Sequence, residues 1–489
     1  MKWLTNIFLT AACALLIVSC SSETDSERPL SFGDCYVNFA ISVSNGHTFT
    51  RATPAGGEDG DGREAGFGRE NTITGITVIL YQATDINAAE TTPISFVDYY
   101  PVTNTTKDSD TRIEATYETG NQRVPHNTID FTKSYRAIIV ANANLTSTIT
   151  TGSTLGNVRS LTLSKLYSGG NETSSADKCM FFVMSSEQDQ TLDFTATGVK
   201  SQDAAGDYYY NMTSQPLVIE RMAARIDFWS KNSNGYKTSA DNLSYTIPGY
   251  EYDVTSSTDK FVVTGIVPFN LVNGVADYGK EYLIKRLRTN VSDATTTSYL
   301  ADETTSNYVI DPKTMDKVTA TTPALTSSLE NIYTLIGNNK IESTTDNPYY
   351  HSVEAMHGSS SKSTIDSKEN VVVAYPMENC LLPESKLYYH ATGIAIIGYY
   401  YVNGTGTGTP YYYIGYLRHH GEADNYDIQP YTSPLPTTAT MGTTIPMNFG
   451  IVRNNIYRVS INSIDSKGSL ELSIKVKKWD PYIHEYIYM

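Results

Sequence analysis

Few residues in this chain have the spacing that catalysis or metal binding requires. The segment from His351 to His357 lacks the HExxH spacing that brings two imidazoles to one metal ion. The Gly-rich run at 404–408 lies inside an expected hairpin and opens no helix, unlike a phosphate-binding loop. A GxSxG nucleophile elbow does not occur. We therefore predict that the protein is not an enzyme and uses no cofactor.

Acidic residues and cysteines do not form a recognisable metal motif either. Glu58, Asp59 and Asp61 are possible calcium ligands, but a solvated loop is the better interpretation. The five cysteines include no CxxC pair, which argues against a zinc ribbon or a redox dithiol. Whether Cys179 and Cys380 form a disulfide is left open. We predict no metal site.

Cys20 is the residue with the clearest chemical context. Lys2 supplies a positive charge, and an apolar run from Ile7 to Val18 follows that is too short to span a bilayer. The run ends in Ser19-Cys20 before a polar stretch, a pattern that resembles a lipobox, in which the cysteine is acylated. We predict that residues 1–20 are a lipoprotein signal peptide and that lipid on Cys20 attaches the protein to a membrane.

The composition constrains both partners and fold. Charged residues are only 18% of the 489 residues, and the formal net charge is −16 at pH 7. An acidic surface without a polybasic cluster argues against nucleic acid as a partner. Abundant Thr, Ser, Gly, Asn and Tyr favour strands and turns over long helices.

An alternating segment near the N-terminus predicts a first strand. Val37, Phe39, Ile41 and Val43 alternate with smaller or polar residues, the period-two pattern of a half-buried strand. Residues 44–70 then become rich in Gly and charge, which predicts a long exposed loop. Compact domains rarely keep such loops without a function.

Runs typical of strands recur along the rest of the chain, separated by turn signals. The expected strands are 73–81, 135–141, 180–184, 217–219, 224–228, 261–267, 371–375 and the hairpin of 394–402 with 411–417. Short helices are expected at 158–167, 280–287 and 325–335. Many short strands indicate β-sandwiches. We predict an all-β fold of two transthyretin-like β-sandwich domains with a few short helices, divided near Ser214 into 52–214 and 215–489.

Two alternating stretches end the chain. Their apolar positions are Leu470, Leu472, Ile474 and Val476, then Ile483 and Ile487 after a break at Pro481. Chain ends usually fray and are polar. This end instead has the pattern of a strand that is available for pairing.

The order of these features resembles that of the Bacteroidia-type fimbrillins, and among them most closely the major subunits of short (minor) fimbriae. The resemblance rests on the lipobox, the first strand, Arg51 in a Gly-rich loop, the C-terminal strand and the segments 135–142, 220–226, 375–379 and 450–457. It covers nearly the whole chain.

This resemblance implies a function and a set of site residues. The chain would be a structural shaft subunit of a surface fimbria, exported as an outer-membrane lipoprotein. An arginine-specific protease would cut between Arg51 and Ala52, with Arg63 and Arg69 as alternative cut sites. Loss of the segment 21–51, a tether and the first strand, would open a groove. Residues 470–489 of another copy would then fill the groove by strand exchange, giving an extracellular fibre that supports adhesion and includes accessory subunits.

Two other functions stay open. A glycan-binding surface lipoprotein would use the tyrosine clusters at 208–210, 399–401 and 411–413 as sugar platforms. Strand tyrosines more often pack as structural pairs, however. An anchor subunit would keep its first strand, and a tip adhesin would lack the donor end. A cut site together with a donor strand favours a shaft subunit, whose receptor the sequence does not identify.

Overall fold

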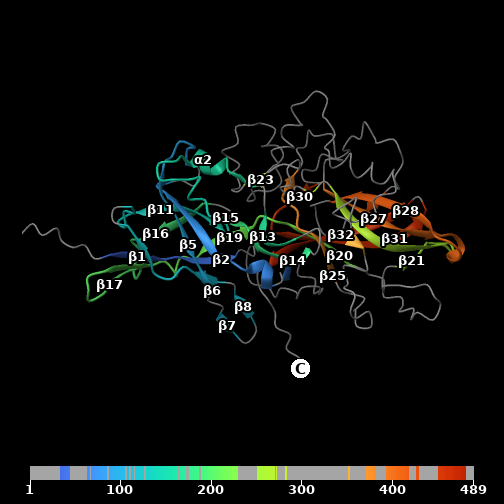
Figure 1. The fold of residues 1–489 in the computed structure, drawn as a ribbon, viewed down its shortest axis with the longest axis horizontal. Helices are drawn as coiled ribbons and strands as arrows, with labels where there is room; N and C mark the ends of the chain where they lie inside the picture. Colours follow the sequence, from blue (N-terminus) through green and yellow to red (C-terminus); the bar gives the residue numbers. More distant parts are fainter. Residues whose placement is uncertain are drawn as a thin grey trace, which may run out of the picture.

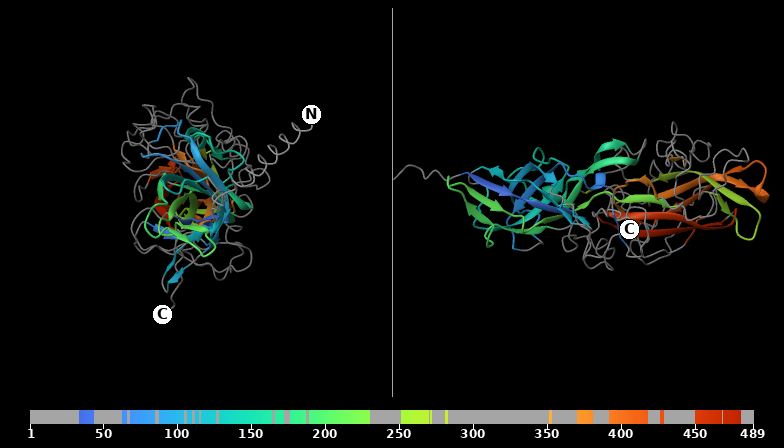
Figure 2. Two further views of the ribbon diagram at one scale, coloured as in Figure 1. Left: turned by 90° about the vertical axis from the view of Figure 1, so that its left-hand side faces the viewer. Right: turned by 90° about the horizontal axis from the view of Figure 1, so that it is seen from below.

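The protein is an elongated all-β molecule (Figures 1 and 2). The computed structural model describes residues 34–43, 63–65, 68–84, 88–104, 107–109, 112–114, 116–125, 128–163, 166–171, 176–186, 189–229, 251–269, 271, 281–282, 351–352, 370–380, 392–417, 426–428, 450–467 and 469–480. Within these residues, no helix is long and apolar enough to cross a membrane.

Two sheets build the N-terminal part of the molecule. The larger has the order β5-β4-β11-β15-β19-β2-β9-β6, with β16 also paired to β11. Its strands are β5 (Ile94–Pro101), β4 (Gly75–Tyr81), β11 (Ser134–Ala141), β15 (Met184–Ser186), β19 (Leu217–Arg221), β2 (Ala40–Val43), β9 (Thr116–Glu118), β6 (Thr103–Asn104) and β16 (Gln190–Asp193). The smaller has the order β10-β1-β18-β17. Its strands are β10 (Gln122–Val124), β1 (Cys35–Asn38), β18 (Tyr208–Asn211) and β17 (Lys200–Gln202).

Two further sheets build the C-terminal part. One has the order β25-β20-β31-β32-β29, with β3 also paired to β32, and the other has the order β21-β22-β27-β28, with β24 paired to β22. The strands of the first are β25 (Asn370–Ala374), β20 (Arg225–Trp229), β31 (Asn455–Ser466), β32 (Ser469–Asp480), β29 (Tyr426–Ile428) and β3 (Arg63–Ala65). Those of the second are β21 (Glu251–Asp253), β22 (Lys260–Phe269), β27 (Gly393–Tyr401), β28 (Thr409–Tyr416) and β24 (His351–Ser352).

Short elements complete the described part. Four small strand pairs join β12 (Thr162–Leu163) to β23 (Glu281–Tyr282), β13 (Tyr167–Asn171) to β14 (Ala176–Phe182), β26 (Asn379–Cys380) to β30 (Gly450–Ile451), and β7 (Lys107–Ser109) to β8 (Arg112–Glu114). The helical elements are α2 (Leu155–Arg159) and the 3₁₀ turns η1 (Gly68–Asn71) and η4 (Val402–Gly404).

The strands predicted at 73–81 and 135–141 are confirmed as β4 and β11, and most of their residues are buried on both faces of the sheet. Every residue of β4 is buried, as are the last five of β11, and the two strands pair antiparallel. In the β27–β28 hairpin, the connection bends at Asn403 and Gly404, both at positive φ. Gly398 lies close to β22: a Cβ atom at this position would be 2.2 Å from the carbonyl oxygen of Val262, so only glycine fits here.

The helix predictions were largely wrong. The segment 158–167 contains only the end of α2, followed by β12 and the start of β13. Glu281 and Tyr282, inside the expected helix 280–287, form β23 instead and pair with β12. Tertiary pairing here overrides the local pattern. The segment 325–335 lies outside the described residues.

The described residues form two hydrophobic cores, and the chain passes from one to the other between Ala223 and Ala224. β19 therefore belongs to the N-terminal core, although it lies past Ser214, where we expected the division. Val372, Tyr375, Met377 and Ile456 also reach into the N-terminal core from C-terminal segments. The division into two sandwich domains stays a prediction, and the cores show that the two parts are packed together.

Candidate functional site

The first strand crosses from one N-terminal sheet to the other, running from one end of the molecule toward its middle (Figures 1 and 2). β1 lies between β10 and β18, and β2 lies between β9 and β19. Phe39 is the residue between the two strands. The segment therefore has a neighbouring strand on both sides along nearly its whole length.

Backbone hydrogen bonds hold the crossing point. The Phe39 amide donates to Thr119 Oγ1 at 2.9 Å, and the Thr119 amide donates to the Phe39 carbonyl at 3.0 Å. The Met212 amide donates to the Asn38 carbonyl at 2.9 Å, and the Tyr208 amide donates to the Asp34 carbonyl at 2.9 Å. These contacts use the main chain of the first strand, so another strand of different sequence can make them too.

The apolar side chains of the first strand are buried as predicted. Val37, Phe39 and Ile41 have no exposed surface, and Val43 is 3% exposed. Phe39 stacks on Tyr100, with ring centroids 5.9 Å apart. The simple alternation of a half-buried strand fails in the middle, because Asn38 and Ala40 are also buried. A strand that leaves one sheet for another is covered on both faces where it crosses.

Polar contacts fix the two ends of β1. The side-chain Nδ2 of Asn38 donates to Glu118 Oε2 at 3.0 Å. At the outer end, Arg123 forms an ion pair of 2.7 Å with Asp34. Burial, together with the charge of Asp34, raises the pKa of the free Cys35 thiol. Tyr36 stacks on Tyr209 of β18, with centroids 5.0 Å apart.

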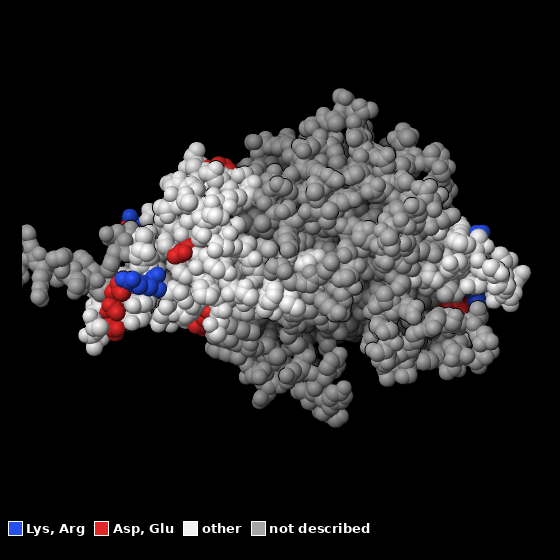
Figure 3. Space-filling view, viewed as in Figure 1, with Lys and Arg blue, Asp and Glu red and all other residues white. Residues whose placement is uncertain are grey.

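Charged residues of both signs gather at the end of the molecule where β1 begins (Figure 3). They include Asp34, Arg123, Lys200, Asp203 and Asp207. Asp203 accepts hydrogen bonds from the amides of Asp207 and Ala205, and these bonds hold its pKa below the ordinary value. Among the described residues, no group of His, Cys, Asp or Glu could hold a metal ion.

Two of the predicted donor-strand residues lie in the core of their own molecule. Leu470 and Leu472 belong to β32 and are fully buried in the C-terminal core. Ile474 and Val476 follow in the same strand and pair with Val459 and Tyr457 of β31. Ile483 and Ile487 lie outside the described residues. The structure thus shows β32 as a full member of its own sheet.

The prediction of an exposed loop over 44–70 is wrong at its C-terminal end, which contains β3, the first residues of η1 and the buried Glu70. Arg63 begins β3, which pairs in parallel with residues Lys478–Asp480 of β32. Arg69 lies in η1, whose next two residues, Glu70 and Asn71, are buried. Cys20, Arg51 and Ala52 lie outside the described residues.

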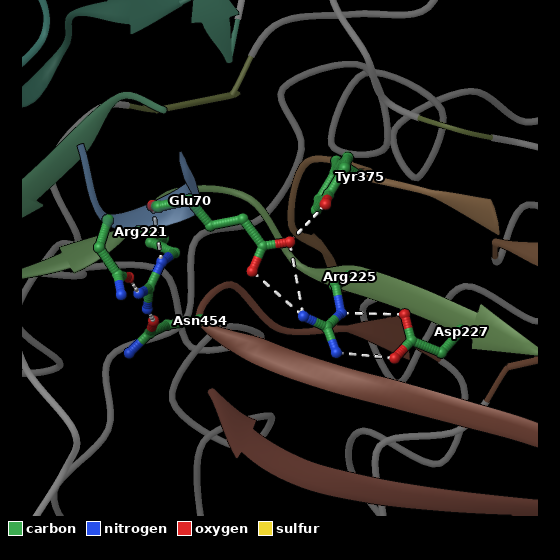
Figure 4. Close-up of polar contacts among 7 residues, drawn as sticks. Glu70, Arg221, Arg225, Asp227, Tyr375 and Asn454 are labelled. Atoms are coloured by element: carbon green, nitrogen blue, oxygen red, sulfur yellow. Dashed lines mark hydrogen bonds and ion pairs between the residues drawn. The ribbon is translucent and has the colours of Figure 1, made fainter. Parts of the chain in front are cut away.

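Glu70 is the centre of a buried polar cluster between the two cores (Figure 4). Its carboxylate accepts from Arg225 Nη1 at 3.1 Å and from the Tyr375 hydroxyl. Arg225 also makes a two-point contact with Asp227, at 2.9 and 2.8 Å. All of these side chains are at most 1% exposed. The segment just after the arginine-containing loop is therefore anchored to the C-terminal part.

Arg221 extends this cluster across the same junction. It donates to the Glu70 carbonyl at 3.2 Å, to the Asn71 side chain, and to Asn454 Oδ1 at 3.1 Å (Figure 4). Close by, Arg453 pairs with Glu378 at 3.0 Å and reaches Ser185 of the N-terminal sheet at 3.4 Å. These contacts are buried and close, so removing one side chain takes a hydrogen-bond partner from a buried polar group.

Sequence reasoning found the strand but missed the residues that hold it. Thr119 and Glu118 lie in a stretch without any strong pattern, and only the fold brings them to Phe39 and Asn38. The segment 220–226 drew attention as a motif, and it contains Arg221 and Arg225. Nothing in the sequence pairs them with Glu70, more than a hundred residues earlier.

A search of solved structures finds similar chains among fimbrial and cell adhesion proteins. No family model matches the chain, and no curated protein matches its sequence. A candidate cell adhesion protein from Parabacteroides distasonis is 14% identical, with a TM-score of 0.44 over 91% of this chain and 97% of that one.

Two proteins of Porphyromonas gingivalis are also similar. A fimbrilin, FimA, is 13% identical with a TM-score of 0.38 over 91% of this chain and 98% of its own. The tip fimbrial protein Mfa3, with a C-terminal truncation, is 8% identical with a TM-score of 0.35 over 91% of this chain and 100% of its own. The short-fimbria subtype stays a prediction.

Proposed function

We propose that this protein is the structural shaft subunit of a surface fimbria and polymerises by exchanging β-strands. The observation that carries the proposal is the position of the first strand between its neighbouring strands; we call the place of each of its residues a seat. β1 and β2 complete two sheets at once, and the sequence predicts a long loop after them that contains Arg51. A cut in that loop turns a tethered strand into a separate peptide.

The energetics of such an exchange are reasonable. Burial of each apolar side chain of the first strand contributes roughly 1.5–3 kcal/mol. Each backbone hydrogen bond adds a net ~0.5–1.5 kcal/mol. While the chain is intact, the tether keeps the strand at a high effective concentration, which keeps the groove filled. After a cut, the first strand is no longer tethered, so a strand from a second copy can compete for its position.

The empty seat would not persist in water. Loss of residues 35–43 would leave β18, β10, β19 and β9 each with an open edge along one side. Open edges beside an apolar groove invite pairing with another chain. Because the groove lies in the N-terminal sheets and the donor comes from the C-terminal part of another copy, the contact is head-to-tail and extends into a filament.

Among the three arginines of the loop, Arg51 is the proposed cut site. A protease requires a segment that can adopt an extended conformation in its active site, and such segments lie in exposed loops. Arg63 is paired within β3, and Arg69 precedes the buried Glu70 and Asn71 in η1. A cut at Arg51 also leaves η1 and its junction contacts intact.

The remaining steps come from the sequence resemblance. Cys20 would carry the lipid that holds the precursor at the outer membrane. An arginine-specific protease would remove residues 21–51. Residues 470–489 of another copy would then enter the groove, and accessory subunits would complete an extracellular fibre. No catalytic step is assigned to this chain itself.

The glycan-binding alternative has one observation in its favour. Tyr36 and Tyr209 form a half-buried stack on the outer face of the smaller N-terminal sheet, and such a surface suits a sugar ring. Tyr36, however, belongs to the strand that a cut at Arg51 would release. Glycan binding at this stack therefore requires the first strand to stay in place, whereas strand exchange requires it to leave.

The experiment that tests the proposal treats the chain from Cys20 onward with an arginine-specific protease. We expect a new N-terminus at Ala52, loss of the peptide that contains residues 35–43, and oligomer ladders that boiling disrupts. Arg51→Ala should abolish both the cut and the ladders, and Arg63→Ala should abolish neither. A cut chain that keeps its first strand and stays monomeric would favour an anchor or glycan-binding lipoprotein.

A further inference from the structure

The groove of the first strand accepts a strand of either direction as far as the backbone is concerned. β1 is parallel to β18 and antiparallel to β10. β2 is likewise parallel to β19 and antiparallel to β9. A reversed strand would again make one parallel and one antiparallel ladder in each sheet. The direction of an incoming strand must therefore be set by side chains.

The apolar seats do not set the direction either. The groove offers apolar seats at positions 37, 39, 41 and 43, and a small one at Ala40, which is 2% exposed. In the predicted donor segment, Ser473 is flanked symmetrically by Leu472 and Ile474, then by Leu470 and Val476. With Ser473 at the seat of Ala40, both directions place an apolar residue in each of the four seats.

The two directions differ in the charge that arrives at the seat of Asn38. In the direction of the native strand, Glu471 would occupy that seat. In the reverse direction, Lys475 would occupy it. The other charged residue then takes the seat of Ser42, which is half-buried and lies between Thr116 and Val218, both uncharged.

Glu118 lies where it can discriminate between Glu471 and Lys475 at the position of Asn38. Its carboxylate accepts a hydrogen bond of 3.0 Å from the Asn38 side chain, and Asn38 is only 8% exposed. When the first strand leaves, that carboxylate loses its donor. An ammonium group in the same seat restores a hydrogen bond and adds charge attraction, whereas a second carboxylate is repelled.

We propose that Glu118 selects the direction of the incoming strand, so that residues 470–476 of a second copy lie reversed relative to the strand they replace, with Lys475 beside Glu118. The inference rests on the proposed strand exchange and specifies its geometry. The donor strand leaves its own sheet, where Glu471 accepts from Asn462 and Ser463 at 2.9 and 3.0 Å. That loss is the same for both directions and does not favour either.

A charge exchange between Glu118 and the donor strand tests the direction. Protease-treated Glu118→Lys should form at least about tenfold fewer oligomers than the native chain, because like charges then meet at a nearly buried seat. Adding Lys475→Glu should restore the oligomers, and adding Glu471→Lys should not. An oligomer yield that does not fall with Glu118→Lys, but falls when Glu471→Lys is added, would overturn the proposal in favour of the native direction, because Glu471 would then lie beside residue 118.

Single substitutions in the donor give a second measurement that leaves the groove unchanged. Lys475→Glu alone should lower oligomer yield about as much as Glu118→Lys, while Glu471→Lys alone should change it less than about twofold. If neither Glu118→Lys alone nor Lys475→Glu alone changes the oligomer yield, the role of Glu118 is overturned while strand exchange stands. If the native chain loses its first strand and stays monomeric, the proposed function fails and the direction fails with it.

Discussion

The first and the last described strands of the chain are held in contrasting ways. The first strand is split between two sheets, as β1 and β2 of four residues each. All of its partners are distant in sequence, at 116–124 and 208–219. β32 instead runs for twelve residues in one sheet, and its main partner is β31, which immediately precedes it.

This difference shows why a cut in one loop has a large effect. A local hairpin such as β31–β32 does not depend on a distant covalent link within its own chain, because its turn keeps both strands close. The first strand depends on its covalent link to the rest of the chain, since every contact closes a long loop. Cutting the link removes the effective concentration of the tether and leaves only the contacts of a short peptide.

The largest expected effects come from core substitutions in the two strands, compared in the uncut precursor and in assembled fibres. Phe39→Ala should destabilise the uncut precursor by about 3–5 kcal/mol, because it removes a fully buried ring. Leu472→Ala should cost about 2–5 kcal/mol in the same denaturant unfolding experiment. In assembled fibres, Phe39→Ala should have no effect, because the strand has left, while Leu472→Ala should still weaken them. Fibres that Phe39→Ala weakens would show that the first strand is retained.

The junction between the two cores provides the next effect. Glu70→Ala should lower the free energy of unfolding by about 1–3 kcal/mol, because the buried Arg225 and the Tyr375 hydroxyl each lose one hydrogen-bond partner, while Arg225 keeps its contact with Asp227. Arg123→Ala is the matched control, since it breaks the ion pair with Asp34, in which the Arg123 side chain is 67% exposed. That control should change stability much less, because solvent screens an exposed ion pair. Equal effects of the two substitutions would argue against a junction held by buried charges.

A smaller effect is expected at the crossing point of the first strand. Thr119→Val keeps the shape of the side chain and removes the oxygen that accepts from the Phe39 amide. The unsatisfied buried amide should cost about 1–3 kcal/mol in the uncut precursor. Thr119→Ser keeps the hydroxyl and should recover most of that loss. A neutral Thr119→Val would show that water replaces the hydroxyl.

The smallest effect is a pH dependence in the loop beside β11. Hydrogen bonds from the Thr132 hydroxyl, from Lys133 and from the Thr132 amide lower the pKa of Asp130 to about 2. Because the folded value lies below the unfolded one, this contribution to stability is present above about pH 4. It is lost as the pH falls through 2. Carboxyl NMR titration should show the low pKa, and Thr132→Ala should raise it toward the ordinary value.

Much of the strand pattern follows from the sequence alone. Val37, Phe39, Ile41 and Val43 alternate, and the structure buries all four. The runs at β4, β11 and β27 were predicted because β-branched and aliphatic residues crowd there. The Asn403-Gly404 turn was predicted because these residues tolerate positive φ. The patterns are local, so one segment is enough to recognise them.

Tertiary structure decided what the local pattern does not contain. Asn38 and Ala40 are buried because the strand switches sheets there, and Glu281–Tyr282 is a strand because β12 is beside it. Glu118 and Thr119 acquire their roles only when β9 pairs with β2. Glu70 meets Arg225 across a junction that joins residues far apart in the chain. The sequence by itself determined which segments form strands, because side-chain periodicity is local. Neighbours, sheet crossings and buried charge pairs depend on long-range packing, and only the fold determined them.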